Sequence, residues 1–516
     1  MVFAVVIALH AIGGGVFLLD DNPSILENHS LLKSLPEALQ SSNFRYLTYA
    51  LNWANLQVFG YSAQAFHMTN VALHIIASLM LFFLVRLFTE TDQTAAALAA
   101  AWFALNPAIN MSVLYISARS TILATIWTIA AISAYLKFER EGRAHWLIAA
   151  LLASVAAMLS KENGIAAPAL IIAMGLISSD KRRWAIAAIL MLAASLSFVT
   201  LRLRQFIYLG PESATPTSFE YFLTQMTVIP RYLLQLMWPV GIALEQHAPI
   251  RTGLLDPAVI AGAVGMAVVW CYALWRLRAS KAAVFFLVWL PITFAPESSI
   301  VPFIDTIFLH RVYMPAAGLA ALVAYALLVP ARAETGFRGK RVVLAASGVL
   351  MVCFALFDVS TSLVWKTEIG VRRQSVRVSP DKFRTRYDFG VELIRELQYR
   401  AARPHLESAV LIGDPTAVRR ARAWNALGKV RYRLGDFSGA AECFIAASRE
   451  NPIWNDPFLN AGLTLLRIEK PAEALEYLER AAALGLQSEQ LISATNRARK
   501  AVQTLQPDGG SDTISP

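Results

Sequence analysis

Charged residues are scarce in this chain. Lys, Arg, Asp and Glu make up 16% of the 516 residues, whereas hydrophobic residues make up 56%. The apolar residues come in long blocks rather than at amphipathic spacing, and the mean hydropathy is +0.49. This composition excludes an ordinary soluble domain and is typical of a polytopic membrane protein.

Cysteine is also rare. Cys271, Cys353 and Cys443 are far apart, which excludes a disulfide framework. No His, Cys and Asp cluster has the spacing of metal ligands, so we expect no cofactor, with a divalent metal left open. The 46 basic residues outnumber the 36 acidic ones. This excess favours membrane lipid headgroups and phosphate groups as partners, and no segment resembles a nucleic-acid-binding module.

The first apolar block, residues 1–19, carries no charge. It lacks a basic segment in front and a small-x-small cleavage motif behind, so we expect a retained membrane helix rather than a secretory signal. Two adjacent carboxylates, Asp20 and Asp21, follow at once. Because charge is costly at bilayer depth, such a pair marks either the solvated end of a helix or a functional site. We interpret this pair as a site.

Ten further apolar blocks predict an all-α membrane helix bundle of about eleven spans. They cover residues 68–87, 94–105, 113–136, 144–160, 165–177, 184–201, 257–275, 282–294, 312–329 and 342–364. Residues 20–67 are expected to form the first outer loop, with short helices on the membrane surface. Residues 221–240, interrupted by Pro230 and Pro239, are expected to be interfacial or re-entrant on the outer side.

Basic residues in short loops set the expected orientation. Four loops are expected on the inside, with Lys137, Arg140 and Arg143; Lys181, Arg182 and Arg183; Arg276, Arg278 and Lys281; and Arg332, Arg338, Lys340 and Arg341. Because such loops favour the cytoplasm, the acidic pair, Asn106, residues 160–163 and residues 296–311 are all expected outside. Basic residues between Lys366 and Arg386 argue against an outer C-terminus. Long domains translocate largely regardless of charge, so we expect an outer C-terminus.

The region after residue 365 is soluble in composition and repetitive. Gly428 and Gly462 stand 34 residues apart, and so do Ala440 and Ala474. A period of 34 with small residues at these positions is typical of tetratricopeptide repeats. A degenerate earlier copy fits Gly390, Ala402, Leu406 and Ala409, with a four-residue insertion near residues 414–422. We therefore expect a membrane domain over 1–365, a repeat domain over 366–505 and a disordered segment over 506–516.

An outward-facing carboxylate pair, a multi-span bundle and outer loops with cations are the parts needed to transfer a sugar from a lipid phosphate. A carboxylate can deprotonate an incoming hydroxyl, and Arg or Lys can neutralise the phosphate that leaves. Short motifs then follow in a fixed order. They are Asp20-Asp21 through Asn28, Arg45-x-Leu47-Thr48, Phe66-His67-x-x-Asn70-x-x-x-His74, Ile116-Ser117-x-Arg119, Ser160-Lys161-Glu162-x-Gly164-Ile165 and His310-Arg311-x-Tyr313-x-Pro315-x-x-Gly318.

In these motifs and their order, almost the whole chain resembles the transmembrane, tetratricopeptide-containing O-mannosyltransferase family and its bacterial relatives of the GT-C glycosyltransferase fold. Three positions depart from the family. Asn106-Pro107, followed by Ile109 and Met111, stands where the family has His-Pro and a downstream Glu. Arg45-Tyr46 replaces an Arg-Pro, and Ser120 or Thr121 replaces an acidic residue. These departures leave the expected fold intact and bear on the identity of the donor or acceptor.

The resemblance implies a polyprenyl-phosphate-linked sugar as donor and a hydroxyl acceptor, either protein or glycan, recruited by the repeats. Asp20 would be the catalytic base, with Asp21 in support. The residues that would line the donor-phosphate cavity are Arg45, Arg119, Lys161, Glu162, His310, Arg311 and Tyr313. The expected location is a bacterial inner membrane with the repeats in the periplasm, or alternatively the endoplasmic reticulum membrane.

Each assignment has a structural alternative. His67, Asn70 and His74 recur at helical spacing and fit a polar stripe that makes hydrogen bonds inside the bundle. Arg119 and Arg311 fit residues that snorkel to the headgroups, and Lys161-Glu162 fits a simple loop pair. For the whole protein, the alternatives are a non-catalytic membrane scaffold for envelope assembly and a polymerase or ligase of surface polysaccharide.

Overall fold

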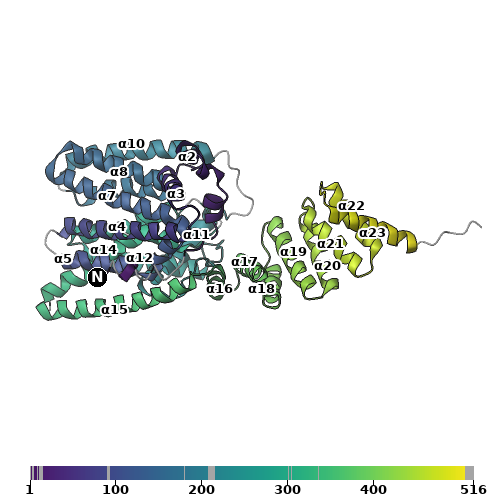
Figure 1. Cartoon of the computed structure of the whole chain (residues 1–516). Coiled ribbons are helices and arrows are strands. Elements are labelled where there is room, and N and C mark those ends of the chain that lie inside the picture. Colours follow the sequence, from purple (N-terminus) through teal and green to yellow (C-terminus); the bar gives the residue numbers. More distant parts are fainter. Residues whose placement is uncertain are drawn as a thin grey trace, which may run out of the picture. The chain divides into compact units, whose positions relative to one another are not determined.

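A computed structural model gives the architecture of the chain (Figure 1). It describes residues 15–89, 93–178, 180–206, 216–299, 305–334 and 336–505, together with Val2, residues 5–7, His10, Pro302 and Phe303. Every element in these ranges is a helix, which confirms the predicted all-α fold. The chain divides into two compact units, Met1–Val371 and Arg372–Pro516. The predicted disordered segment 506–516 and most of the predicted first span lie outside the described residues.

The first unit is a bundle of long helices with short helices at one end (Figure 1). Its elements are η1 (Asn22–Leu26), η2 (His29–Leu32), α2 (Leu35–Gln40), α3 (Tyr46–Phe59), α4 (Ala63–Thr89), α5 (Gln93–Leu105), α6 (Pro107–Leu114), η3 (Ile116–Ala118), α7 (Arg119–Glu141), α8 (Ala144–Ser160), η4 (Glu162–Ile165), α9 (Ala166–Ala173), η5 (Met174–Leu176), α10 (Lys181–Phe206), α11 (Ser218–Met237), α12 (Pro257–Leu277), α13 (Lys281–Phe294), η6 (Leu309–Val312), α14 (Tyr313–Glu334) and α15 (Gly336–Val364). Helix α16 (Glu368–Val378) contains the boundary between the units.

The described residues contain six helices long and apolar enough to cross a membrane, or up to seven if one bent pair counts as a span. The six are Ala63–Phe88, Ile116–Glu141, Lys181–Leu201, Pro257–Leu277, Leu309–Leu328 and Arg341–Val364. The predicted count of about eleven spans is not confirmed. Three predicted spans are apolar helices of 10–17 residues, Ala144–Ser160, Glu162–Ala173 and Lys281–Phe294. At 1.5 Å per residue, helices of this length fall short of a hydrocarbon core of about 30 Å.

The bent pair is α5 and α6, which meet at 55° around Asn106-Pro107. Asn106 is extended at ψ 120°, as the residue before a proline prefers, and its side chain accepts a hydrogen bond from the Ala108 N–H at 3.0 Å. Proline at the first position of α6 needs no N–H partner. Asn106 and Pro107 therefore build a helix break and its cap.

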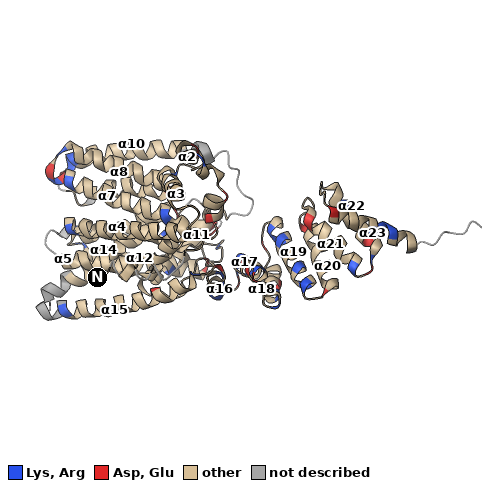
Figure 2. Ribbon diagram, in the orientation of Figure 1, with Lys and Arg blue, Asp and Glu red and all other residues tan. Residues whose placement is uncertain are grey.

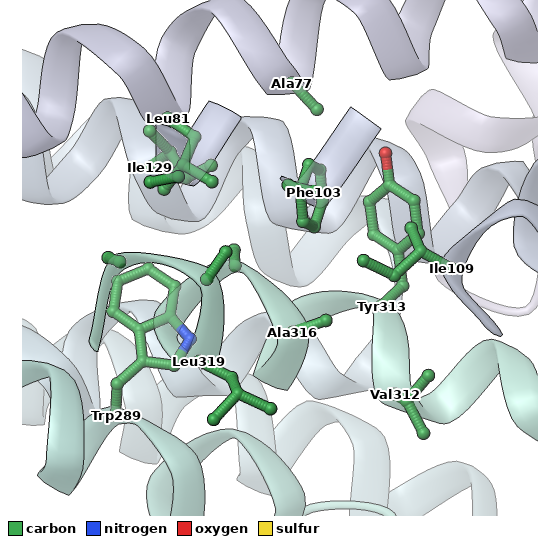
Figure 3. Packing of buried hydrophobic residues seen from close by; sticks show 14 of the residues in the cluster. Ala77, Leu81, Phe103, Ile109, Ile129, Trp289, Val312, Tyr313, Ala316 and Leu319 are labelled. Carbon is green, nitrogen blue, oxygen red and sulfur yellow. The ribbon is translucent and has the colours of Figure 1, made fainter. Parts of the chain in front are cut away.

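The bundle interior is close-packed around aromatic residues of α5, α13 and α14 (Figure 3). The Trp289 indole Nε1 donates to the Met314 carbonyl at 2.9 Å. A Cβ on Gly318 would come within 2.3 Å of Trp289 Cδ1, so only glycine lets α14 approach α13 this closely. Phe103 and Tyr313 pack edge to face with ring centroids 5.1 Å apart.

One end of the bundle gathers basic residues where α7 turns into α8 and α10 begins (Figure 2). Arg140 on α7 donates to the Leu87 carbonyl near the end of α4. Arg183 on α10 donates to the Glu139 carbonyl at 2.6 Å. The loops expected to share the cytoplasmic side through Arg140 and Arg183 thus meet at one end, which we call the basic end.

The opposite end, which we call the site end, is covered by the segment that follows the acidic pair. Short helices η1, η2, α2 and α3 fold there around a small apolar core of Ile25, Leu31, Ala38, Leu56, Phe66 and Ile116. Thr48 on α3 donates to the Ser160 carbonyl at the end of α8, at 2.9 Å. These contacts attach the first loop to the helix ends that carry the predicted site residues.

The second unit is a stack of helix pairs. Its helices are α17 (Phe383–Arg395), α18 (Tyr399–Ile412), α19 (Ala417–Arg433), α20 (Phe437–Glu450), α21 (Asn455–Arg467), α22 (Pro471–Ala483) and α23 (Glu489–Leu505). A glycine on the first helix of each pair faces a large residue on the second, as Gly390 faces Leu406, Gly428 faces Phe444 and Gly462 faces Leu478. This recurring contact explains the repeat pattern of the sequence, including its degenerate first copy.

The predicted insertion lies at the start of α19. This helix begins at Ala417, 11 residues before Gly428, whereas α17 begins at Phe383, 7 residues before Gly390. The four extra residues therefore add about one turn to the helix.

Gly428→Val should destabilise the second unit by about 1–3 kcal/mol, because a Cβ there would lie 2.6 Å from the Phe444 ring. Hydrogen exchange of α19 and α20 in the full-length protein measures the loss, and Phe444→Leu in the same chain should restore part of it. Ala482→Val on the exposed side of α22 is the control. Equal exchange in the Gly428 and Ala482 variants would contradict the packing argument.

Candidate functional site

The acidic pair lies in a tight turn at the site end. Leu19 has φ 48°, in the left-handed region that a branched side chain rarely adopts. The Asp21 N–H donates to the Leu18 carbonyl at 2.9 Å and closes the turn. As a result the two neighbouring carboxylates point in different directions, since Asp20 is exposed and Asp21 is fully buried. Backbone strain of this kind persists where surrounding contacts hold it, often at functional sites.

Asp21 is the buried anchor of the turn. Its Oδ2 accepts from the Leu18 N–H at 2.8 Å. Its Oδ1 accepts from the Ser117 N–H at 2.8 Å and also from the Ser117 hydroxyl. Burial raises the pKa of Asp21 from 3.8 to about 7, against the opposing effect of these hydrogen bonds. The Asp21 carboxylate thus ties the first loop to η3, the short helix directly before α7.

Asp20 is the accessible member of the pair. Its backbone N–H donates to the Tyr115 hydroxyl at 3.2 Å, so the phenol lies beside the exposed residue. Burial, together with the nearby Asp20 and Asp21, raises the pKa of Tyr115 well above its ordinary value. The Tyr115 ring in turn lies 6.2 Å from the His310 ring. A neutral phenol and an imidazole therefore lie on the same side as the carboxylate that could accept a proton.

A second group of polar residues joins the loops after α8 and α13. Lys161 Nζ lies 2.5 Å from Glu297 Oε1, and both side chains are more than nine-tenths buried. Lys161 also donates to Thr121 Oγ1 at 2.9 Å, and Asn163 donates to Glu297 Oε2 at 3.0 Å. Burial lowers the pKa of Lys161, although Glu297 opposes the shift. Because Lys161 and Glu297 each make a further hydrogen bond, to Thr121 and from Asn163, the ion pair is tightly held.

Arg45 and Glu162 form a more accessible pair next to it. The Arg45 Nε and one terminal nitrogen both approach the Glu162 carboxylate, with the closest contact at 3.0 Å. The side chains are 39% and 31% exposed, so solvent reaches this pair and an incoming anion could compete for Arg45. Of the predicted cavity cations Arg45, Arg119, Lys161 and Arg311, Arg45 is therefore the one open to a ligand.

Arg119 and Arg311 are buried. Arg119 donates only to neutral oxygens, Asn70 Oδ1 at 3.1 Å, Asn52 Oδ1 at 2.9 Å and the Phe66 carbonyl at 2.8 Å. Arg311 donates to the Tyr221 hydroxyl at 3.1 Å and lies over the Phe303 ring. Both side chains are enclosed by the protein, whereas a snorkelling residue extends from its surface. The donors of Arg119 are used in holding α3, α4 and α7 together.

The remaining predicted residues divide between the site and the bundle interior. His310 lies beside Tyr115 at the site end. Tyr313 lies inside the bundle, where its hydroxyl is 2.7 Å from His74 Nδ1 (Figure 3). Asn70 donates toward the Val113, Tyr115 and Ile116 carbonyls, so Asn70 and His74 have the hydrogen-bonding role of the structural alternative. The buried His67 ring has no hydrogen-bond partner among the described residues.

Four residues that contribute to this site were not predicted from the sequence. They are Tyr115, Ser117 as a hydrogen-bond donor to Asp21, Tyr221 and Glu297. Glu297 had a usable signal, because it is a carboxylate directly after an apolar block, just as Asp20 is. The other three are uncharged residues in apolar surroundings, and only their contacts distinguish them. In the described ranges no group of three or more His, Cys, Asp and Glu side chains could hold a metal ion.

The structure therefore defines a helical protein with several membrane-length helices, a polar site at one end and a C-terminal domain of helical repeats. The chain is 22% identical over 420 residues to a protein O-mannosyl-transferase of Caenorhabditis elegans. The matched part covers 73% of this chain and 57% of that relative, so the chain spans little more than half of the relative's length. No family model matches the chain.

Solved structures of repeat proteins share low similarity with the chain. YrrB, a TPR protein with an unusual peptide-binding site, is 18% identical with a TM-score of 0.23, covering 44% of this chain and 97% of its own. The TPR domain of P58(IPK) is 14% identical with a TM-score of 0.23, covering 72% of this chain and 99% of its own. Scores this low carry no argument, and the repeat architecture is concluded from the helix pairs themselves.

Asp21→Asn should flatten the pH dependence of stability. Because the pKa of Asp21 is about 7 when folded and 3.8 ordinarily, the folded chain binds the extra proton between these values. The contribution of Asp21 to the free energy of unfolding therefore falls as the pH rises from about 4 to about 7. The total decrease over this range is on the order of 4 kcal/mol. Thermal unfolding in detergent across this range measures it. Glu27→Gln, which removes an exposed acid nearby, should keep the wild-type profile; an unchanged slope in Asp21→Asn would contradict the assignment.

Glu297→Leu should cost about 3–5 kcal/mol of stability, because it leaves the Lys161 ammonium buried without its counter-ion. The double variant Lys161→Met/Glu297→Leu should lose less than this single variant, since no charge stays buried. Lys470→Met, which breaks an ion pair with both side chains about half exposed, should cost less than about 1 kcal/mol. Thermal unfolding measures all three, and additive losses in the double variant would disprove the coupling.

Proposed function

We propose that the protein is a membrane glycosyltransferase that moves a sugar from a polyprenyl-phosphate donor to a hydroxyl acceptor, which we take to be a protein. The observation that carries the proposal is the divided acidic pair, with exposed Asp20 held in place by buried Asp21 at the end of a bundle of membrane-length helices. The distant similarity to a protein O-mannosyl-transferase agrees with it.

In this proposal, Asp20 is the catalytic base. An exposed carboxylate can orient and deprotonate the acceptor hydroxyl as the new glycosidic bond forms. The bond between the sugar and the phosphate breaks at the same time, and the leaving phosphate needs a cation. Arg45 is the most accessible of the predicted cavity cations, and its partner Glu162 would be displaced when the phosphate arrives. No metal or other cofactor is required in this scheme.

The site is proposed to face away from the cytoplasm. Lys and Arg gather at the basic end, and short basic loops favour the cytoplasm. The site end would then lie in the periplasm of a bacterial inner membrane, or in the lumen if the membrane is that of the endoplasmic reticulum. Helix α15 ends near this face, since Asp358 on α15 accepts from Asn110 Nδ2 on α6 at 2.6 Å. The repeats that follow are proposed to be extracytoplasmic and to recruit the acceptor.

Asp20→Asn should lower sugar transfer by about 10²–10⁴-fold, because the amide cannot accept the hydroxyl proton. The assay uses purified full-length protein, mannose on a polyprenyl phosphate and envelope protein as acceptor, with intact-mass detection of the product. The matched control, Glu27→Gln, removes an exposed acid of the same loop and should retain transfer.

Undiminished transfer by a correctly folded Asp20→Asn variant would remove the catalytic assignment. A wild-type protein that binds partners but no polyprenyl-phosphate sugar would instead support the membrane scaffold. Transfer to growing glycan chains with none to protein would support a polysaccharide polymerase or ligase. Size exclusion in detergent establishes that each variant is folded.

A further inference from the structure

Helix α19 carries charge of a single sign. Its 17 residues, Ala417–Arg433, include six basic and no acidic side chains. The six are Arg419, Arg420, Arg422, Lys429, Arg431 and Arg433. Basic residues are visible along this helix in Figure 2.

Three of these cations are neutralised within the repeats. Arg420 lies 2.8 Å from Glu450 Oε2, and Arg431 lies 3.4 Å from Glu407 Oε1. Arg419 lies 3.6 Å from the Asp414 carboxylate. Their charge is accounted for by the fold itself.

The other three, Arg422, Lys429 and Arg433, are exposed, and none has a carboxylate at ion-pair distance among the residues that the structure describes. We call them the basic stripe. Their spacing of seven and then four residues places them on one face of the helix. Lys429 and Arg433 are like charges one turn apart, an arrangement that destabilises a helix unless an anion lies between them. The stripe therefore has unused capacity for negative charge.

Two features beside the stripe suit a polypeptide ligand. Asn460 on α21 donates to Asn425 Oδ1 on α19 at 3.0 Å, which links neighbouring repeats on this side of α19. Arg433 lies over the Tyr399 ring, and Arg467, at the same position of the next repeat, lies over the Phe437 ring. Cations stacked on rings keep a fixed position without losing their charge.

We propose that the basic stripe docks an extended acidic segment of a partner protein. The stripe runs over 12 residues from Arg422 to Arg433, and the eleven steps between them give roughly 16 Å of helix. An extended chain covers that length in about five residues. Because side chains alternate along an extended chain, acids at every second position would all face the stripe. An anionic membrane surface would favour a broad basic cluster rather than a single line of three cations flanked by ion pairs.

This inference is independent of the proposed transfer reaction, because it concerns binding to the repeats and is tested with no sugar donor present. Should the acidic segment belong to the acceptor, the stripe would contribute to acceptor selection. Failure of transfer and failure of docking therefore remain distinguishable.

The test is fluorescence anisotropy with full-length protein in neutral detergent and a labelled peptide of alternating Glu and Ser. A peptide with Gln in place of Glu is the probe control. We expect binding of the Glu peptide that weakens with added salt. The variant Arg422→Gln/Lys429→Gln/Arg433→Gln should weaken it about tenfold or more. Arg480→Gln/Arg497→Gln/Lys500→Gln removes three exposed cations from α22 and α23 and should bind as wild type.

A charge-reversed stripe, Arg422→Glu/Lys429→Glu/Arg433→Glu, should bind a Lys and Ser peptide in place of the Glu peptide, which shows that the variant is folded. Equal binding by wild type and the stripe variant, or equal losses in the stripe and control variants, would overturn the proposal. Competition by short-chain phosphatidylglycerol at lower concentration than the Glu peptide would also overturn it, in favour of an anionic lipid.

Discussion

The Asp21 carboxylate is the contact on which the site depends. It accepts hydrogen bonds from the Leu18 N–H in the turn and from Ser117 at the start of the α7 segment. Through these bonds, a short irregular loop is held against the end of a long rigid helix. The strained backbone at Leu19 is kept in place by the same contacts, and it turns the neighbouring Asp20 outward. A buried acid thus positions an exposed one, and its three donors offset only part of the energetic cost of burying the first carboxylate, since its pKa is still raised to about 7.

A related constraint governs the cations. In a low-dielectric interior, a charge needs a partner or a set of hydrogen-bond acceptors. Lys161 has Glu297, and Arg119 has two asparagines and a carbonyl. These residues stabilise the arrangement of helices and are not free to receive a ligand. The Arg45 and Glu162 pair is shared with solvent, so ligand binding there would exchange one ionic partner for another.

The repeats apply the same physical rule in water. Three arginines of α19 are matched by carboxylates of neighbouring helices, while the cations of the basic stripe are left to solvent. Leaving these exposed cations without ionic partners costs little free energy, because water and salt screen their charge. The repeat domain can therefore keep unpaired basic residues on one face for binding a partner. Unpaired charges inside the membrane bundle would destabilise the fold.

Sequence by itself determined where helices form and which residues recur in the repeats. It also indicated that charged residues at the ends of apolar segments are candidate site residues. These properties are local, since hydrophobic runs, proline breaks and a 34-residue period are properties of neighbouring residues. The predicted number of spans is not confirmed, because apolar content alone does not reveal that Ala144–Ser160 and Lys281–Phe294 form helices of only 10–17 residues. Only the tertiary structure decided that Asp20 faces out and Asp21 faces in, that Tyr313 pairs with His74, and that Glu297 neutralises Lys161. Each of these results depends on the packing of segments distant in sequence, and no local pattern specifies which distant groups will share a buried environment.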